Sequence, residues 1–185
     1  MKSRLCRVIT SFMVLMCGCH VYVAGHKLKQ NTEKQVTQCD DKLQSLVKQL
    51  ETGREGLFES HVVRDRSGNI VEVCLTSDMV SDGNLNGLSA LPKVSKLALY
   101  CCANNAEPLT EHSFNLLKKF KQLRCLVLYG AVDELSLSIC NAIASVDSLE
   151  ELTIEYSKIA ADGGSVLKKM RLKNLRISES CTILE

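Results

Sequence analysis

Apolar residues between positions 117 and 128 recur at a helical spacing and then switch to alternation. Leu117, Phe120 and Leu123 follow one another at steps of three, and Leu126 and Leu128 then lie two apart. A helix keeps a period of about 3.6 residues, whereas a half-buried strand alternates. This stretch is therefore predicted to be the end of a helix that turns into a short strand.

The same pattern recurs before and after this stretch. The pairs that anchor the expected strands are Val73 and Leu75, Leu97 and Leu99, Leu126 and Leu128, Leu152 and Ile154, and Leu175 and Ile177. Successive pairs lie about 23 to 29 residues apart, a spacing typical of repeat architectures. One such unit is too thin to bury its own leucines, so neighbouring units must stack. The pattern predicts an α/β fold: a short solenoid of about five parallel strands with helices on the convex side.

The segment before the repeats divides into a polar tether and a helix, which together occupy residues 26–58. Apolar residues at helical spacing predict an amphipathic helix over about residues 37–50. Two β-rich runs then flank the turn at 65–69, which predicts a β-hairpin. We expect the helix and hairpin to cap a repeat domain over residues 59–185, because a terminal repeat would otherwise expose its core.

Over about residues 60–180 the chain resembles leucine-rich repeat proteins, and most closely exported bacterial members with a helix in each repeat. The segment Val80-Ser-Asp-Gly-Asn-Leu85 is similar to the Ile/Val-Thr/Ser-Asp-x-Gly-Leu motif of that family, with Gly and Asn exchanged. Ser81, Asp82 and Thr110 suit helix N-caps. The family's asparagine at the strand exit is replaced here, at Asp78, Cys102, Ala131, Ser157 and Ser180. The resemblance therefore implies stacked repeats in which the usual amide ladder is missing or partly replaced.

Residues 1–25 have the pattern of an export signal. Three basic residues precede a short apolar run, 8–16, which is too short to span a bilayer. The segment Met16-Cys-Gly-Cys19 resembles a bacterial lipobox, which implies a lipid on Cys19 and a lipoprotein at the cell envelope. Cleavage before His26 and plain secretion is the second interpretation, and an uncleaved anchor is the third.

Charge and composition narrow the function. The formal net charge is +2, and three of the 23 basic residues lie in the expected signal, leaving 20 against 21 acidic residues. A nearly neutral mature protein gives no reason to expect nucleic acid as a partner. No nucleophile elbow, P-loop or His-Glu-x-x-His motif occurs, so we expect neither an enzyme nor a cofactor.

Cysteine is the one reactive residue type in abundance, with ten copies, seven of them outside the expected signal. Cys74 and Cys125 are predicted to face outward but about 10 Å apart, too far for a disulfide. His61 and His112 do not converge on them, so no metal site is expected. The remaining alternative is a reactive thiol. Cys102, Cys140 and Cys181 are expected to be small buried apolar residues.

In a solenoid of this kind, the residues between and beside the anchors face the concave side in rows across the sheet. Tyr100 and Tyr129 are predicted to lie side by side in one such row. Exposed Tyr is enriched in interfaces, although cross-strand pairing that only stabilises the sheet is the simpler interpretation. The candidate partner-binding residues are Tyr100, Val127, Tyr129, Glu151, Thr153, Glu155 and Arg176.

The sequence therefore predicts a non-catalytic module at the cell envelope that offers its concave sheet to a protein partner. Contact with a membrane is expected only through the lipid anchor. Two alternatives stay open: an inhibitor that covers the active site of a partner enzyme, and a purely structural envelope protein with no discrete ligand.

Overall fold

A computed structural model describes residues 41–52, 59–76, 78–101, 109–130, 132 and 134–184. The chain divides into two compact units, Met1–Lys42 and Leu43–Glu185, and the second holds most of the described residues. The expected signal with Cys19, the tether and the start of the amphipathic helix lie outside the described residues. Within the described ranges, no helix has the length and apolar character that crossing a membrane requires.

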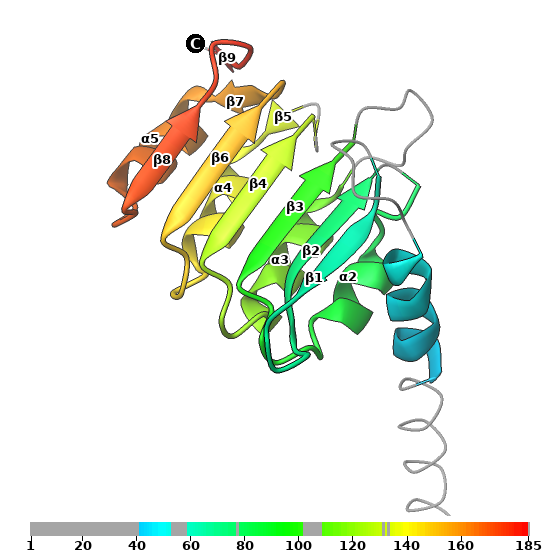
Figure 1. Cartoon of the computed structure of the whole chain (residues 1–185). Helices are drawn as coiled ribbons and strands as arrows, with labels where there is room; N and C mark the ends of the chain where they lie inside the picture. Colours follow the sequence, from blue (N-terminus) through cyan, green and yellow to red (C-terminus); the bar gives the residue numbers. More distant parts are fainter. Residues whose placement is uncertain are drawn as a thin grey trace, which may run out of the picture. The chain divides into compact units, whose positions relative to one another are not determined.

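The centre of the second unit is a six-stranded sheet with the order β1-β2-β3-β4-β6-β8 (Figure 1). Neighbouring strands from β2 to β8 are parallel, and β1 pairs with β2 in the antiparallel direction. The strands are β1 (His61–Arg64), β2 (Ile70–Thr76), β3 (Lys96–Tyr100), β4 (Cys125–Tyr129), β6 (Glu151–Glu155) and β8 (Asn174–Ile177). The predicted α/β class with a mostly parallel sheet is confirmed, as is the hairpin.

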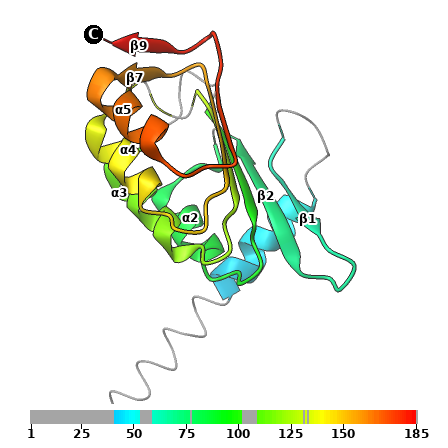
Figure 2. The same cartoon turned by 90° about the vertical axis from the view of Figure 1, so that its left-hand side faces the viewer.

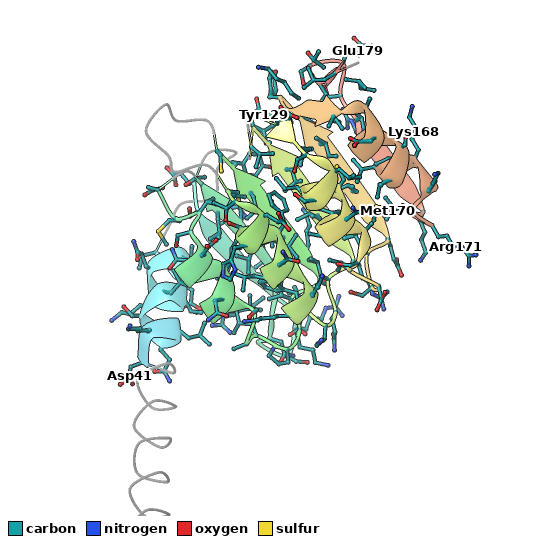
Figure 3. The ribbon with its side chains drawn as sticks, turned by 180° about the vertical axis from the view of Figure 1, so that it is seen from behind. Asp41, Tyr129, Lys168, Met170, Arg171 and Glu179 are labelled. Carbon is teal, nitrogen blue, oxygen red and sulfur yellow. The ribbon has the colours of Figure 1, made fainter. Side chains whose placement is uncertain are left out.

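Helices cover one face of this sheet, as Figure 2 shows from the side and Figure 3 from behind. They are α2 (Asp82–Leu88), α3 (Glu111–Leu116) with the 3-10 turn η1 (Leu117–Lys119), α4 (Leu137–Ala144) and α5 (Ala161–Lys169). Ser81 and Thr110 are N-caps, as predicted, whereas Asp82 is the first helical residue. The helix expected to reach Leu123 ends earlier, because the backbone at Phe120 leaves the helical conformation and the chain turns back into β4.

A second, three-stranded sheet was not predicted from the sequence. It consists of β5 (Glu134–Leu135), β7 (Lys158–Ala160) and β9 (Thr182–Leu184), all parallel. Each of these strands follows a strand of the main sheet along the chain, and β5 and β7 directly precede helices α4 and α5. This arrangement pairs backbone groups on the loops that lead from strand to helix.

The strand anchors predicted from the sequence lie in register across the main sheet. Val73 faces Leu97, which faces Leu126, then Leu152 and finally Leu175, and the second anchors align in the same way. From β2 to β6 all of these side chains are at most 1% exposed. Full burial of one such side chain contributes about 1.5–3 kcal/mol. In β8, at the end of the sheet, Leu175 and Ile177 are only half-buried.

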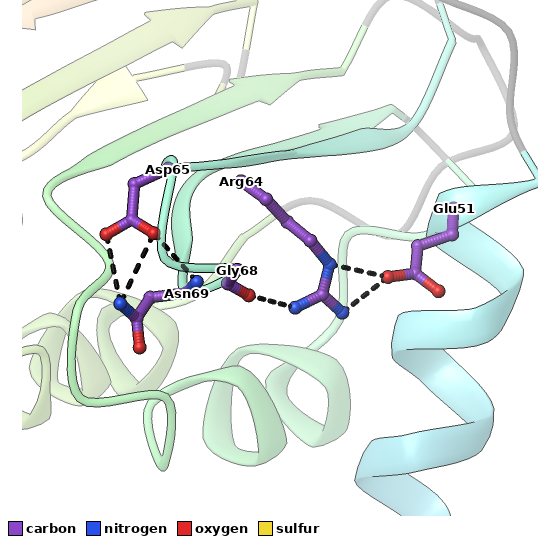
Figure 4. A network of polar contacts seen from close by, with 5 residues as sticks. All are labelled: Glu51, Arg64, Asp65, Gly68 and Asn69. Carbon is purple, nitrogen blue, oxygen red and sulfur yellow. Dashed lines mark hydrogen bonds and ion pairs between the residues drawn. The ribbon is translucent and has the colours of Figure 1, made fainter.

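The described part of the predicted N-terminal helix runs over residues 41–51. Leu50 is 1% exposed, and Leu43, Leu46 and Val47 pack against the core of the domain. Glu51 accepts hydrogen bonds from the guanidinium of Arg64 at the end of β1, and the same guanidinium donates to the backbone oxygen of Gly68 (Figure 4). The helix is therefore held to the domain core by apolar packing and to the hairpin by an ion pair.

Candidate functional site

The candidate site lies on the face of the main sheet that the helices leave uncovered, which we call the open face; Figure 1 looks onto it. Side chains alternate along each strand, so residues between and beside the buried anchors point to this face. The register places every candidate residue there: Tyr100 on β3, Val127 and Tyr129 on β4, Glu151, Thr153 and Glu155 on β6, and Arg176 on β8. The geometry that the sequence analysis expected is therefore present.

Three tyrosines, which we call the tyrosine row, form a continuous aromatic contact at the exits of β3, β4 and β6. Tyr100 and Tyr129 face each other in register, with ring centroids 5.5 Å apart. The ring of Tyr129 also contacts that of Tyr156 at 4.6 Å. Both ring pairs are tilted, a geometry that aromatic side chains prefer over a flat sandwich. Tyr156 is the most exposed of the three, at 57%.

Tyr156 was not among the predicted site residues, and its backbone explains how it joins the row. Its φ is +53°, in the left-handed region, and the equivalent residue after β4 is Gly130 with a φ of +57°. Its N–H donates to the hydroxyl of Ser180 at 3.0 Å, whereas the N–H of Gly130 donates to the backbone oxygen of Glu155. A side chain in this conformation costs about 1–2 kcal/mol. The chain therefore keeps a strained tyrosine at a position where glycine would be relaxed.

Ser157 and Ser180 lie at two of the strand exits where the resemblance to leucine-rich repeats leads one to expect asparagine. The hydroxyl of Ser157 donates to the backbone oxygen of Glu155, and that of Ser180 accepts from Tyr156. Serine hydroxyls thus satisfy backbone groups at the strand exits in place of an amide. The sequence alone left open whether the ladder is missing or partly replaced. The hydroxyl of Ser180 supports the conformation of Tyr156 by accepting from its backbone N–H.

Several of the charges on the open face lie at the strand entrances. The ammonium of Lys96 contacts the carboxylate of Glu72 at 2.7 Å, and this hydrogen bond raises the pKa of the lysine. On the next strands Cys125 lies opposite Glu151. Burial raises the pKa of the Cys125 thiol, and the nearby negative charge of Glu151 raises it further. A thiol in this setting stays protonated at neutral pH.

The prediction that Cys74 faces outward was wrong in one respect. It lies on the open face, but it is only 3% exposed, between His61 on β1 and Ala98 on β3. Burial raises its pKa to about 11. The structure therefore gives this thiol neither the access nor the ionisation that a reactive cysteine requires.

The other cysteines serve packing or backbone contacts. Cys140 is buried as expected, and its thiol donates to the backbone oxygen of Leu135 at 3.7 Å. Cys181 is half-buried, and its thiol donates to the backbone oxygen of Ile154 at 3.3 Å. The cysteines that the structure describes are free thiols, and nowhere in the described ranges do three or more potential metal ligands come together. Cys102 lies outside the described residues.

A cleft of about 620 Å³ lies away from the tyrosine row, between the helix of residues 41–51, the hairpin turn and residues 91–93. Leu43, Val47 and Leu91 contribute to its apolar lining, and Lys48 and Lys93 are among its polar residues. The guanidinium of Arg64, which also lines it, is already engaged by Glu51 and Gly68. Its lining residues include no cysteine, serine or histidine that could act as a nucleophile or base.

Comparison with known proteins adds no assignment to this geometry. No protein-family model matches the chain, and a search of curated protein sequences finds no significant match. The function therefore has to be argued from the residues on the open face.

Proposed function

We propose that this chain is a short leucine-rich repeat solenoid that acts as an exported, non-catalytic protein-binding module. The open face of its sheet would be the concave side, and the tyrosine row would be the centre of the contact. Five neighbouring parallel strands carry aligned apolar anchors on the face that the helices cover, and the other face is open. This arrangement supports the solenoid. The open face then presents rows of side chains that no helix of the described chain covers.

The single observation that carries the binding role is the strained, exposed Tyr156 at the end of an aromatic row. A tyrosine that served only to pair with Tyr129 would not need a left-handed backbone conformation. Strained residues persist where the surrounding structure holds them, and they cluster at functional sites. Tyrosine also suits a contact with protein, because it offers a large rigid surface and a polar tip.

Charged and small residues around the row fit the rim of a protein interface. Glu155 on β6 lies opposite Tyr129, Arg176 on β8 lies opposite Thr153, and Glu151 lies at the entrance of β6. Val127 and Thr153, next to the row, leave room for a partner side chain. Neither Cys74 nor Cys125 supplies a thiolate at neutral pH, because burial raises the pKa of both. This favours binding over covalent catalysis as the role of this face.

The binding role is tested by site-specific photo-crosslinking in the producing cell. A photoreactive phenylalanine analogue at Tyr156 should capture a discrete partner, whereas the same analogue at the exposed Lys168 of α5, on the helical side, should not. The captured partner should bind the purified chain saturably. Replacing Tyr129 and Tyr156 with alanine should weaken that binding at least about 30-fold, the scale of an interface hot spot of about 2 kcal/mol. A Lys168→Ala variant is the control.

Unchanged affinity of the Tyr129→Ala/Tyr156→Ala variant, with a native circular dichroism spectrum, would refute the patch. Equal capture at positions 156 and 168 would favour the structural envelope protein instead. If the captured partner is an enzyme whose activity falls on binding, the inhibitor interpretation is supported.

The proposed location at the cell envelope depends on residues 1–25. The intact mass of the protein recovered from cells distinguishes a lipid on Cys19, cleavage before His26 and an uncleaved chain. A Cys19→Ser variant should lose the lipid mass and detach from the membrane fraction. If the mass shows neither lipid nor cleavage, the export part of the proposal fails while the binding part stands.

A further inference from the structure

Within the described residues, no strand lies beside the outer edge of β8, the last strand of the main sheet. Among the described strands, β8 pairs only with β6. The N–H groups of Asn174 and Ser178 donate to oxygens on the β6 side, those of Glu150 and Ile154. Because backbone groups alternate in direction along a strand, the N–H and C=O groups of Leu175 and Ile177 point to the outer edge.

Apolar side chains accompany this edge. The anchors of β4 and β6 are at most 1% exposed, whereas Leu175 and Ile177 are only half-buried, as are Met170 and Leu172 before them. Ile183 on β9 is 48% exposed. An open strand edge beside apolar side chains is a template for pairing with another chain.

The opposite edge of the sheet is not built in this way. Strand β1 is as short as β8, but its pairing with β2 shifts register between Val63 and Arg64. A local irregularity of this kind discourages the addition of a further strand. Repeated head-to-tail pairing of β8 with β1 is therefore disfavoured, and the partner of β8 has to present a different surface.

Charges at the two ends of β8 identify that surface. Arg171 precedes the strand and Glu179 follows it; both are exposed, and they lie at opposite ends in Figure 3. A parallel neighbour of the same sequence would place Arg171 beside Arg171. An antiparallel neighbour related by a two-fold axis would place Arg171 beside Glu179 twice.

We propose that the chain forms a dimer in which β8 pairs with β8 of a second copy, antiparallel across a two-fold axis at Leu175. In this register the outward N–H and C=O groups of the two Leu175 residues bond each other, and their half-buried side chains become neighbours in a joined core. Arg176 lies opposite Asn174, and Arg171 opposite Glu179. A register centred one residue further would place two Arg176 side chains directly opposite, which is repulsive.

The dimer is tested first by charge reversal on the full chain, as recovered from cells in mild detergent. Molar mass by light scattering should change from one to two protomers as the concentration rises. Arg171→Glu should weaken the dimer about tenfold or more, because two attractive pairs become repulsive. Adding Glu179→Arg should restore it. Lys118→Glu on η1 is the matched control, and thermal melts confirm that each variant is folded.

The register is tested by disulfide trapping. Asn174 and Arg176 of opposite copies would form a non-hydrogen-bonded pair, with Cα atoms about 4.5 Å apart, close enough for a disulfide. A variant carrying both Asn174→Cys and Arg176→Cys should give a covalent dimer, and peptide mapping should find the 174–176 bond. Neither single variant should form a disulfide at its new cysteine.

Three results would overturn this dimer: a monomer at every concentration, a polymer that keeps growing, or cross-linking of Arg176→Cys alone. A dimer that is indifferent to Arg171→Glu would also exclude it. None of these outcomes bears on the tyrosine row, so the dimer and the proposed binding function fail or stand separately.

Discussion

The left-handed conformation of Tyr156 leads to a prediction that reverses a general rule of protein stability. Alanine normally stabilises a folded chain relative to glycine by about 0.5–1 kcal/mol, because glycine loses more conformational freedom on folding. At a φ of +53° this order should invert. Alanine would incur the left-handed strain of about 1–2 kcal/mol, which glycine does not.

The comparison of Tyr156→Gly with Tyr156→Ala isolates this backbone effect. Both variants lose the contact with the ring of Tyr129, worth about 0.5–1.5 kcal/mol, so that loss cancels between them. Two effects remain: the left-handed strain destabilises the alanine variant, and the larger loss of conformational entropy on folding destabilises the glycine variant. Their difference should leave the glycine variant more stable by about 0.5–1 kcal/mol. Urea unfolding followed by circular dichroism measures the difference as a shift in midpoint at constant slope.

A matched pair at a helical position provides the control. Asn141 is exposed within α4, where Asn141→Ala should be more stable than Asn141→Gly by about 1 kcal/mol. The two positions should therefore show opposite signs in the same assay. If Tyr156→Ala equals or exceeds Tyr156→Gly in stability, the residue is not strained, and the main argument for a binding role of Tyr156 is lost.

Three further predictions concern other parts of the domain. Gly163→Ala should destabilise the fold by about 1–3 kcal/mol in urea unfolding, because its Cβ would lie 2.8 Å from the sulfur of Cys140; an unchanged midpoint would contradict this contact. Glu151→Gln should speed alkylation of Cys125 at neutral pH, since it removes a charge that raises the thiol pKa; peptide mass spectrometry follows the rate, and no change would argue against their proximity. Hydrogen bonds from Asn69 lower the pKa of Asp65 below its ordinary value of 3.8. The ionised carboxylate therefore contributes its full stabilisation above pH 3.8, and this stabilisation is lost as the pH falls through the lower pKa of the folded state. The stability gap between the native chain and Asp65→Ala should therefore narrow in acid, and a gap that widens would refute the assignment.

The strands of the main sheet were predictable because their apolar anchors alternate and recur at a nearly constant interval. That pattern depends only on burial against the next strand, so it can be read without coordinates. It also placed Tyr100 and Tyr129 side by side, as the structure has them. The strands of the second sheet have two or three residues each, which is too short for a period to be visible.

Features that depend on neighbours across the fold could not be predicted. The burial of Cys74 depends on the flanking strands β1 and β3, and alternation alone assigns it only to a face. The contribution of Tyr156 depends on a backbone conformation for which the sequence held one clue: Gly130 occupies the equivalent position after β4. The equivalent residues after β3 and β8 are Cys101 and Glu179, so glycine is not a regular feature of the strand exits and their comparison could not have singled out this conformation.

Because Gly163 has no side chain, it affects how the main sheet and its helices curve. An added Cβ would meet Cys140 of α4 at 2.8 Å and the backbone oxygen of Leu135 at 3.2 Å, so α5 approaches α4 more closely than a larger residue would allow. In an arc of stacked units, the inner radius is set by strand spacing and the outer radius by helix spacing. Bringing two helices together shortens the outer arc while the inner one is unchanged. In the proposed solenoid, the stack should therefore straighten between its last two units, and a bulkier residue at position 163 would increase the curvature there.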